Sequence, residues 1–362
     1  MQGCCSSPAR MNILIIKTSS LGDVVHALPV LEYLREVVPD ARIDWVIDEA
    51  FEDLVAGHPA LHAVRVAALR RWKRHFVSGA TWRELAAFLS SLRATNYNLV
   101  FDLQGNAKSA LICVAARSPR KIGFARENLQ ERIAALATDE GVPFDASDVH
   151  AVQRYLRVVA KPFGVEPDAV RQQPRIATST ADEVTADKAL GDSTGPWLLF
   201  HGGSSWRSKL WFDAGWIELG RALLEQLPTA AVLLSWGGAE ERARAEGIAT
   251  ALGPRARLLP RLGLKPLTAV LGRCALAVAP DTGPLHLAAA AGTATVSIYR
   301  CTDGRRNGPF GPRHAIVQAP LDCSACWRGT CVRDAVCACS ITPEAVLAAA
   351  LPLLRLAGGA RV

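Results

Sequence analysis

The stretch NILIIKTSSLGDVVHALPVL, residues 12–31, decides the fold. Its first part, Asn12 to Lys17, is a run of branched apolar residues without alternation, which predicts a strand covered on both faces in a parallel sheet. From Val24 onward, apolar residues recur at steps of three and four, which predicts an amphipathic helix. The stretch therefore forms the first half of a βαβ unit, with Asp23 at the carboxyl end of a strand, where α/β proteins bind ligands.

Asp23 has two compatible interpretations. As an N-cap, its carboxylate would accept a hydrogen bond from the free amides of the first helical turn. As a general base, it would be aimed at a substrate hydroxyl, with Gly22 keeping the loop thin enough for the substrate to approach. His26 lies on the same helix face, where it would orient the carboxylate or, as we favour, fill a partly buried slot.

Length and composition indicate a globular protein of two domains. The 362 residues exceed the usual size of one core, and half of them are apolar. No apolar run approaches the eighteen or so residues of a membrane-spanning helix. Residues 1–10 lack the apolar core of a secretory signal, and we expect them to be a disordered N-terminal extension.

The formal charge of +7 points to an anionic partner. Much of the excess lies in RRWKRHF, residues 70–76, which predicts a basic, aromatic face for an anionic surface or substrate. A solvated helix end is the alternative. A nucleic-acid binder is less favoured, because aromatic residues are not interleaved along a sheet and no reading helix is evident.

Strand-like runs alternate with helical patterns along the chain, which predicts parallel sheets. The strand-like runs lie at 43–47, 98–104, 197–203, 231–238, 276–280 and 294–299. A stretch of small polar residues that ends in Gly and Pro marks a linker region with a short helix inside it. We expect an N-terminal Rossmann-like domain at 11–180, a linker region at 181–196, a C-terminal Rossmann-like domain at 197–345, and a helix and tail at 346–362.

Two motifs in the second half suit a diphosphate. HGGSSWRSKLW, residues 201–211, follows a strand and offers amides, hydroxyls and Lys209 to phosphate oxygens, although a plain strand-to-helix turn is the alternative. APDTGPLHLAAAAG, residues 279–292, places Thr282 at a helix start whose bare amides suit an anion. Asp281 would grip a sugar hydroxyl, hold His286 or stabilise the turn.

Missing motifs narrow the chemistry. The sequence has no Gly-x-Gly-x-x-Gly, which weakens a dehydrogenase, and no nucleophile elbow. It has no Asp-x-Asp pair to hold a divalent metal on a nucleotide sugar, so a diphosphate would be neutralised by Lys209 and helix amides.

Ten cysteines are expected to be reduced thiols, because nothing in the sequence directs secretion. Five of them crowd together, at Cys323, Cys326, Cys331, Cys337 and Cys339. A zinc site, packing or redox disulfides would each explain this cluster, and we predict no metal.

Six motifs in one order carry a family resemblance. They are KTSSLGDVVHALP, DWVIDEAF, RRWKRHF, DLQGNAKSA, WGGAEE and DTGPLHLAAA, and they lie between about residues 11 and 356. With them, the chain resembles the lipopolysaccharide heptosyltransferases of glycosyltransferase family 9, most of all their type I branch. The resemblance implies an α/β fold of the GT-B class, in which two Rossmann-like domains with parallel sheets face an interdomain cleft.

The implied reaction is an inverting, metal-independent transfer of L-glycero-D-manno-heptose from ADP-heptose to the Kdo of Kdo-lipid A. ADP-heptose is a co-substrate, and no cofactor is implied. The protein would lie in the cytoplasm, peripheral on the inner face of the inner membrane, with no nucleic acid as partner.

The resemblance also implies roles for individual residues. Asp23 matches the base that takes the proton from the Kdo hydroxyl. The donor-binding residues would be Ser204, Ser205, Lys209, Glu240, Asp281, Thr282, Gly283 and His286. The acceptor-binding residues would be Arg70, Arg71, Gln104 and Lys108.

Two departures keep alternatives open. The loop HGGSSWRSK is one residue longer than in familiar type I enzymes, and the cysteine-rich stretch resembles other branches, including heptosyltransferase II. A heptosyltransferase II or another family 9 enzyme with a different acceptor is therefore the alternative, and a nucleotide-sugar epimerase is a more distant one.

Overall fold

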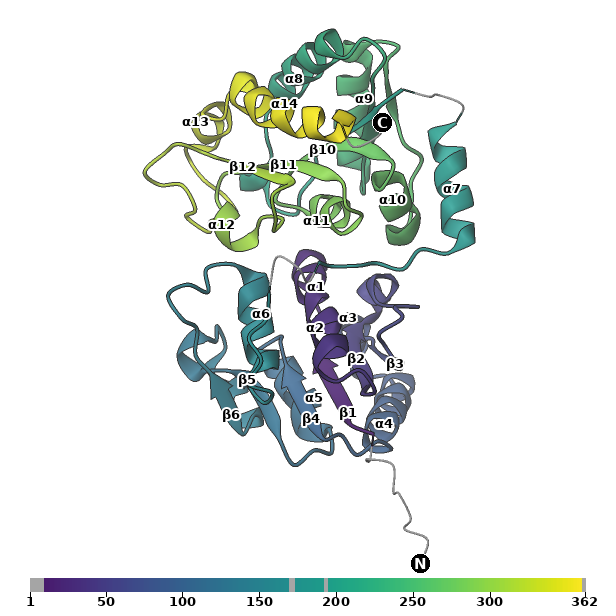
Figure 1. Ribbon diagram of the computed structural model, residues 1–362, viewed down its shortest axis with the longest axis vertical. Helices are drawn as coiled ribbons and strands as arrows, with labels where there is room; N and C mark the ends of the chain where they lie inside the picture. The colour runs from purple at the N-terminus through teal and green to yellow at the C-terminus, as the bar shows by residue number, and fades with distance from the viewer. Residues whose placement is uncertain (1–9, 169–172, 192–194, 360–362) are drawn as a thin grey trace, which may run out of the picture. The chain divides into compact units, whose positions relative to one another are not determined.

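The computed structural model describes residues 10–168, 173–191 and 195–359, so nearly all of the predicted N-terminal extension, 1–10, lies outside the described residues. The chain divides into two compact units, Met1–Ala177 and Thr178–Val362. In each unit, helices cover a central sheet (Figure 1).

The first unit is built on six strands joined mainly by helices. In chain order its elements are β1 (Asn12–Ile16), α1 (Leu21–Ala27), α2 (Pro29–Val37), β2 (Arg42–Asp48), η1 (Glu49–Leu54), β3 (Ala63–Ala67), α3 (Leu69–Arg74), α4 (Gly79–Arg93), β4 (Leu99–Asp102), α5 (Ala107–Ala115), β5 (Lys121–Phe124), η2 (Arg126–Asn128), η3 (Arg132–Ala137), β6 (Glu140–Val142) and α6 (Ala151–Ala160).

The first sheet is parallel, with the strand order β3-β2-β1-β4-β5-β6. The central strand β1 is fully buried from Ile13 to Ile16, as its unbroken apolar run predicts. This order is that of the doubly wound dinucleotide-binding fold, in which the chain changes direction between β1 and β4. Ligands of such folds bind beyond the carboxyl ends of the strands at that switch point.

Helices cover both faces of the first sheet. On one face, Leu14 and Ile16 share a core with buried side chains of α4, α5 and η3, and α3 packs against that core. Alternate residues of a strand point to opposite faces. Helix α6 contacts α1, α2 and strand β5, and these three helices cover the other face.

The second unit repeats this plan. Its elements are α7 (Thr180–Leu190), β7 (Trp197–His201), η4 (Arg207–Lys209), α8 (Asp213–Gln226), β8 (Ala231–Ser235), α9 (Ala239–Leu252), β9 (Ala256–Leu258), α10 (Leu264–Leu271), β10 (Cys274–Pro280), α11 (Gly283–Ala290), β11 (Ala294–Tyr299), α12 (Gly304–Asn307), β12 (His314–Gln318), α13 (Asp334–Cys339) and α14 (Pro343–Gly359).

The second sheet is also parallel, in the order β12-β11-β10-β7-β8-β9. Counted from its own first strand, this is the order of the first sheet, and its switch point lies between β7 and β10. The predicted α/β class with two parallel sheets is confirmed. That the two sheets face an interdomain cleft stays a prediction.

The segments expected at the domain borders belong to the second unit. Helix α7 begins one residue before the predicted linker region, lies otherwise inside it, and packs against α10. Helix α14 begins three residues before the predicted terminal segment and continues into it. It packs against α8, β10, β11 and β12.

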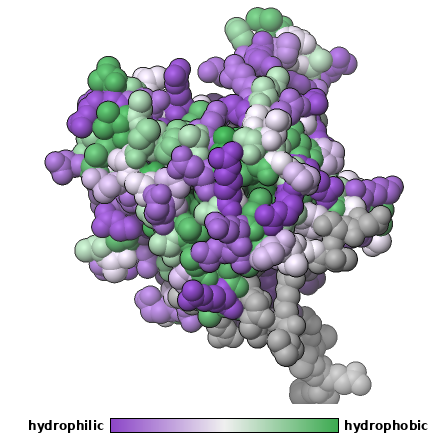
Figure 2. Space-filling view, turned by 90° about the horizontal axis from the view of Figure 1, so that it is seen from above, coloured by the Kyte–Doolittle hydropathy of each residue, from purple (hydrophilic) through white to green (hydrophobic). Residues whose placement is uncertain are grey.

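Asp334–Leu356, which spans α13 and most of α14, is long and apolar enough by length and composition to cross a membrane. The expectation that no run reaches this limit is therefore wrong. Within the fold, 28% of its most apolar eighteen-residue window is buried. On the face seen in Figure 2, hydrophobic residues form small groups between hydrophilic ones.

Candidate active site

Asp23 lies in the first turn of α1, at the carboxyl end of β1. The helix begins at Leu21, with Ser20 as its N-cap, so the interpretation of Asp23 as the N-cap is wrong. Instead, Oδ2 of Asp23 accepts hydrogen bonds from the backbone N (3.2 Å) and Oγ (2.9 Å) of Ser20. Oδ1 accepts none from the described residues, which leaves it open to a substrate hydroxyl.

His26 is buried on the inner side of α1. Its ring meets the edge of the His150 ring, with centroids 5.2 Å apart. This placement agrees with the favoured interpretation that His26 fills a buried slot.

Gln104, at the end of β4, holds the loop that leads to Asp23. Its Oε1 accepts hydrogen bonds from the backbone N atoms of Thr18 (3.1 Å) and Ser19 (3.0 Å) and from Thr18 Oγ1 (3.3 Å). Gln104 is therefore tied to the neighbouring strand's loop across the switch point. The predicted acceptor contact can use only what remains of this side chain, namely its amide nitrogen.

Asp102 stabilises the turn after β4 that carries Gln104. Its carboxylate accepts hydrogen bonds from the backbone N atoms of Gln104 and Gly105, both at 3.0 Å, and from Ser109 Oγ at 2.9 Å. Burial raises the pKa of Asp102 despite these bonds. The bonds fix the turn that presents Gln104.

Lys17 is a buried cation beside these carboxylates, and it was not among the predicted site residues. Its side chain lies with Nζ 4.8 Å from the centre of the Tyr155 ring, and the residue is 3% exposed. Burial lowers the pKa of Lys17, but Tyr155, Asp23 and a further carboxylate outweigh burial and hold it above the usual value. A lysine that ends an otherwise apolar buried strand was the available signal.

The basic residues predicted for the acceptor lie at two places in the first unit. Arg71 pairs with Glu49 (3.1 Å) and Glu84 (2.7 Å), while the guanidinium of Arg70 lies 5.1 Å from the centre of the Phe51 ring. Lys108 lies exposed in the first turn of α5, and its ammonium has no partner among the described residues. Arg71 is thus already paired, whereas Lys108 is free to meet an anion.

In the second unit, Lys209 and His286 converge on Asp281. Lys209 Nζ lies 2.7 Å from Asp281 Oδ2, and His286 Nε2 lies 3.5 Å from Oδ1. Ser204 Oγ donates to the backbone oxygen of Asp281 at 3.3 Å. Four of the residues predicted for the donor therefore meet at the β7–β10 switch point.

The charge state of Asp281 follows from these neighbours. Burial would raise its pKa, but the hydrogen bond from His286 and the charge of Lys209 lower it to about 2. The carboxylate is therefore ionised at neutral pH and pairs with Lys209.

The first turn of α11 completes this place. Thr282 is the N-cap and makes no side-chain capping bond, and Gly283 and Pro284 begin the helix. The first amides of a helix lack intrahelical acceptors and carry the positive end of the helix dipole. This turn suits a phosphate oxygen.

Glu241, and not the predicted Glu240, adjoins the Gly-rich turn after β7. Glu240 is exposed, whereas Glu241 accepts a hydrogen bond from the backbone N of Gly237 at 2.7 Å. A side chain at Gly203 would begin 2.2 Å from the carboxyl carbon of Glu241.

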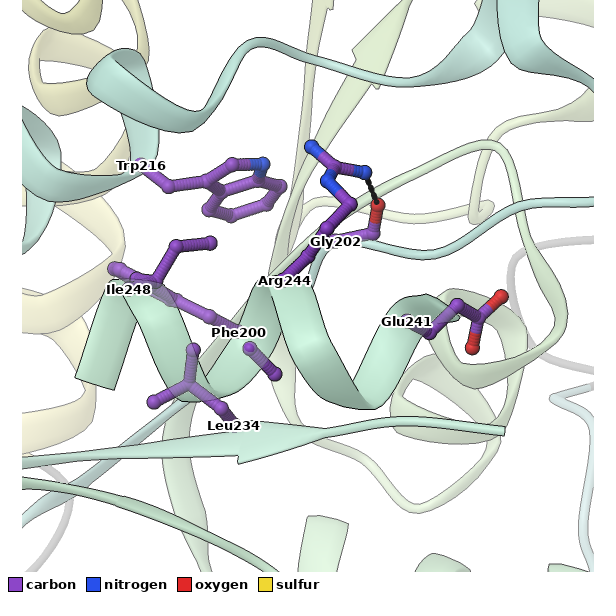
Figure 3. Close-up of a pocket in the computed structure, with 8 residues that line it drawn as sticks. Phe200, Gly202, Trp216, Leu234, Glu241, Arg244 and Ile248 are labelled. Atoms are coloured by element: carbon purple, nitrogen blue, oxygen red, sulfur yellow. Dashed lines mark hydrogen bonds between the residues drawn. The ribbon is translucent and has the colours of Figure 1, made fainter. Parts of the chain in front are cut away.

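Glu241 also lines a small pocket beside β7 and β8, together with Phe200, Gly202, Trp216, Leu234, Arg244, Ala245 and Ile248. Figure 3 shows the aromatic and aliphatic side chains on one side of this pocket and Glu241 on α9, away from them. Arg244 closes the pocket near the turn by donating to the backbone oxygen of Gly202 at 3.0 Å.

The cysteine-rich segment supports the turn η4 that carries Lys209. Ser208 Oγ donates to the backbone oxygen of Arg328 at 2.6 Å and lies 3.3 Å from Cys301 Sγ. Buried Arg300 forms an ion pair with Asp334 Oδ1 at 2.6 Å.

The predicted donor residue Ser205 is exposed and has no side-chain hydrogen bond among the described residues.

The described cysteines are free thiols, Cys323, Cys326 and Cys339 being exposed. Among the described residues, no group of three or more His, Cys, Asp or Glu side chains could hold a metal ion.

Comparisons with known proteins agree with this geometry. The model of glycosyltransferase family 9 (heptosyltransferase) matches residues 85–336. Lipopolysaccharide heptosyltransferase 1 of Pseudomonas aeruginosa is 33% identical over 322 residues, which cover 89% of this chain and 87% of that protein.

Solved structures give the same result. The chain is 30% identical to E. coli heptosyltransferase WaaC with ADP, with a TM-score of 0.74, covering 86% of this chain and 94% of that one. With WaaC bound to ADP-2-deoxy-2-fluoro heptose, identity is 28% and the TM-score 0.75, over 93% and 98% of the two chains. The predicted GT-B class and the family resemblance are confirmed: the chain belongs to glycosyltransferase family 9, the heptosyltransferases.

Proposed function

We propose that the protein transfers L-glycero-D-manno-heptose, with inversion, from ADP-heptose to the Kdo of Kdo-lipid A in lipopolysaccharide inner-core synthesis. The observation that carries the proposal is which chemical groups lie at the two switch points. One offers an open carboxylate oxygen on Asp23, and the other offers Lys209 and the first amides of α11. Family membership supports this pairing of a hydroxyl acceptor with an ADP-sugar donor.

The proposed chemistry needs a base and a stabilised leaving group. Asp23 Oδ1 takes the proton as the Kdo oxygen attacks the anomeric carbon, and the bond from that carbon to the diphosphate breaks. ADP leaves with the electron pair, and its growing negative charge is met by Lys209 and the α11 amides. Because these groups carry the charge, we propose that the reaction needs neither a metal ion nor a cofactor.

The remaining predicted residues follow from this scheme. Ser204, Ser205, Thr282, Gly283 and His286 would surround the donor phosphates, with Asp281 releasing Lys209 to them. Glu240 or its neighbour Glu241 would reach the ribose.

On the acceptor side, Arg70, Arg71 and Lys108 would meet the anionic groups of Kdo-lipid A, with Gln104 shaping the loop. Because that acceptor is a lipid, we propose that the protein works in the cytoplasm as a peripheral protein at the inner face of the inner membrane.

The test is to incubate the protein with ADP-heptose and Kdo-lipid A and to measure the mass of the product by mass spectrometry. A chelator is present to remove metal ions. A gain of one heptosyl residue is expected. A parallel reaction with a heptose-terminated acceptor separates the type II alternative, since transfer to that acceptor alone would replace Kdo in the proposal.

The first prediction concerns the base. Asp23→Asn keeps the side chain's shape but cannot take a proton, so the transfer rate should fall by about a hundred- to ten-thousandfold. ADP binding, measured by calorimetry, should stay unchanged, because Asp23 lies in the other unit from the donor residues. An Asn variant with the full rate would remove Asp23 from the role of base.

A further inference from the structure

One layer of the first unit has features that the proposed reaction does not use. It consists of α3, α4, α5 and η3 with their connections, residues 69–95, 107–121 and 131–138, and we call it the basic layer. These elements share one face of the sheet, the face of Leu14 and Ile16.

The basic layer accounts for the net positive charge of the whole protein. Its three segments contain eleven Lys and Arg residues and two acids, so the rest of the chain has 30 Lys and Arg against 32 acids. Both acids are engaged. Glu84 accepts from Arg71 and from Trp72 Nε1 at 2.9 Å, and Glu131 accepts from the backbone N of Ala107 at 3.0 Å.

Large apolar side chains stand out from the same layer in two patches. The turn between α3 and α4 exposes Phe76 (63%) and Val77 (81%), and Trp82 (58%) follows in the first turn of α4. The second patch lies on α5 and η3, which pack side by side, and it is formed by Leu111 (73%), Val114 (62%), Ile133 (63%) and Leu136 (84%).

Within the first unit, the apolar exposure is concentrated on this layer. Among its described residues, the other large exposed apolar side chains are Val149 (43%) and Val165 (49%), less exposed than any of the seven. Between the two patches, α4 exposes mainly small residues, such as Ala86, Ala87 and Ser90. A broad surface therefore combines apolar side chains with a large excess of cations, of which Arg71 and Arg120 are paired with acids.

We propose that the basic layer docks on the surface of an anionic phospholipid bilayer, with Phe76, Val77 and Trp82 entering the headgroup region. Lysine and arginine beside a bilayer are attracted to anionic lipids, and aromatic and aliphatic side chains add apolar contact with the acyl boundary. The inference rests on the proposed function for its purpose, because a lipid acceptor requires an enzyme at the membrane.

Two other occupants fit this surface less well. A symmetric dimer through the layer would bring eleven cations against eleven, with few acids to offset them. A nucleic acid would be held by phosphate contacts and would leave the exposed aliphatic side chains of α5 and η3 in water.

The test is co-sedimentation with vesicles of phosphatidylglycerol and phosphatidylethanolamine, without donor or acceptor, against vesicles of phosphatidylcholine alone. The full chain should bind the anionic vesicles at least tenfold more strongly. The triple variants Phe76→Ser/Val77→Ser/Trp82→Gln and Lys73→Glu/Arg74→Glu/Arg83→Glu should each lower that binding at least tenfold. The matched control Val149→Ser/Val184→Ser/Val332→Ser, which removes exposed apolar groups elsewhere, should not.

Several outcomes would overturn the docking surface. These are equal binding to neutral vesicles, unchanged binding by both triple variants, tighter binding to duplex DNA than to anionic vesicles, or a dimer in sedimentation equilibrium that the variants abolish. Transfer to detergent-dispersed acceptor, measured alongside, separates the two proposals. An active protein that ignores anionic vesicles contradicts the docking surface alone, and an inactive protein that binds them contradicts the proposed function alone.

Discussion

Lys17 is a buried cation that compensates the negative charge of nearby carboxylates. Its ammonium lies against Tyr155 and in the field of Asp23 and Asp102, of which Asp102 is buried. A buried carboxylate that loses its compensating charge is costly, because the interior solvates it poorly.

Replacing Lys17 therefore tests that compensation. Lys17→Met keeps the chain length and removes the charge, so the free energy of unfolding should fall by about 3 kcal/mol. Urea denaturation measures the change. Lys108→Met, which removes an exposed ammonium, is the control and should stay within about 0.5 kcal/mol of the parent protein. Equal losses in the two variants would show that burial of Lys17 is not what matters.

Asp281 makes stability depend on acid. Its pKa of about 2 in the folded protein lies below the ordinary value of 3.8, so the ionised form stabilises the fold at higher pH. That contribution is complete above about pH 4, is lost as the pH falls toward about 2, and amounts to the order of 2 kcal/mol. The difference in unfolding free energy between the parent and Asp281→Asn should therefore shrink over that interval. A difference that is independent of pH would argue against the pairing with Lys209 and His286.

The predicted donor residues differ in how well sequence could locate them. Lys209, Asp281 and His286 follow strands whose ends adjoin in a doubly wound sheet, so their convergence could be predicted. The support of η4 by Ser208, which was not among the predicted residues, could not be found in this way, because its partner, Arg328, comes from a segment 120 residues away. The role of Glu240 stays a prediction, and the contact of its neighbour Glu241 with the Gly-rich turn reflects helix geometry, since successive positions on a helix point in different directions.

At the scale of elements, the first helix differs from its predicted form. A single helix was expected from Val24 onward, but the chain forms α1 and α2, with Pro29 starting the second. Proline has no N–H to continue the helical ladder and is favoured in the first turn of a helix. The apolar spacing continues across the junction, so periodicity alone does not reveal it.

Most central strands were predicted well, whereas the central strand β5 and the edge strands were missed. The run 294–299 coincides with β11, and 197–203 contains β7. Strands buried on both faces have long apolar runs, whereas the edge strands β6 and β9 have three residues each and mixed composition. Such edges are set by pairing with a neighbour that the local sequence does not specify.

The edge strand β12 contains a histidine that should make stability sensitive to mild acid. Burial, and to a lesser extent Arg313 and His286, lower the pKa of His314 to about 4 from the ordinary 6.5. The fold therefore favours neutral His314, and this stabilisation, on the order of 3 kcal/mol, is lost as the pH falls from about 6.5 to about 4.

The measurement for β12 is denaturation at several pH values in that interval. His314→Gln cannot be protonated, so it should lose less stability on acidification than the parent. It keeps a polar group for Thr295 Oγ1, which lies 2.9 Å from His314 Nδ1. A parallel decline of both proteins would assign the acid sensitivity to other groups, such as His58, whose pKa burial also lowers to about 4.

At the scale of the whole molecule, each unit has its own sheet, core and half of the proposed chemistry. The donor residues lie within Thr178–Val362. We therefore expect residues 178–362, produced alone, to bind ADP with an affinity within about tenfold of that of the full chain. Calorimetry measures the affinity, and circular dichroism checks that the fragment is folded. A folded fragment without ADP affinity would mean that the first unit supplies essential donor contacts.

Sequence could predict two parallel-sheet domains, because βα alternation restarts after the small polar stretch near residue 190. It could not show that three separate segments, around α3, α5 and η3, share one face of a sheet. The sequence therefore indicated an anionic partner and one basic segment, residues 70–76, but not the other segments that share its surface.

The repeated strand order has a consequence for how such enzymes diversify. Since each sheet places its own switch point, the nucleotide-sugar half and the hydroxyl-activating half can change independently. A chimera that exchanges one unit between family members would then acquire a new acceptor while retaining its sugar, which makes recombination, as much as point mutation, a route to new glycans.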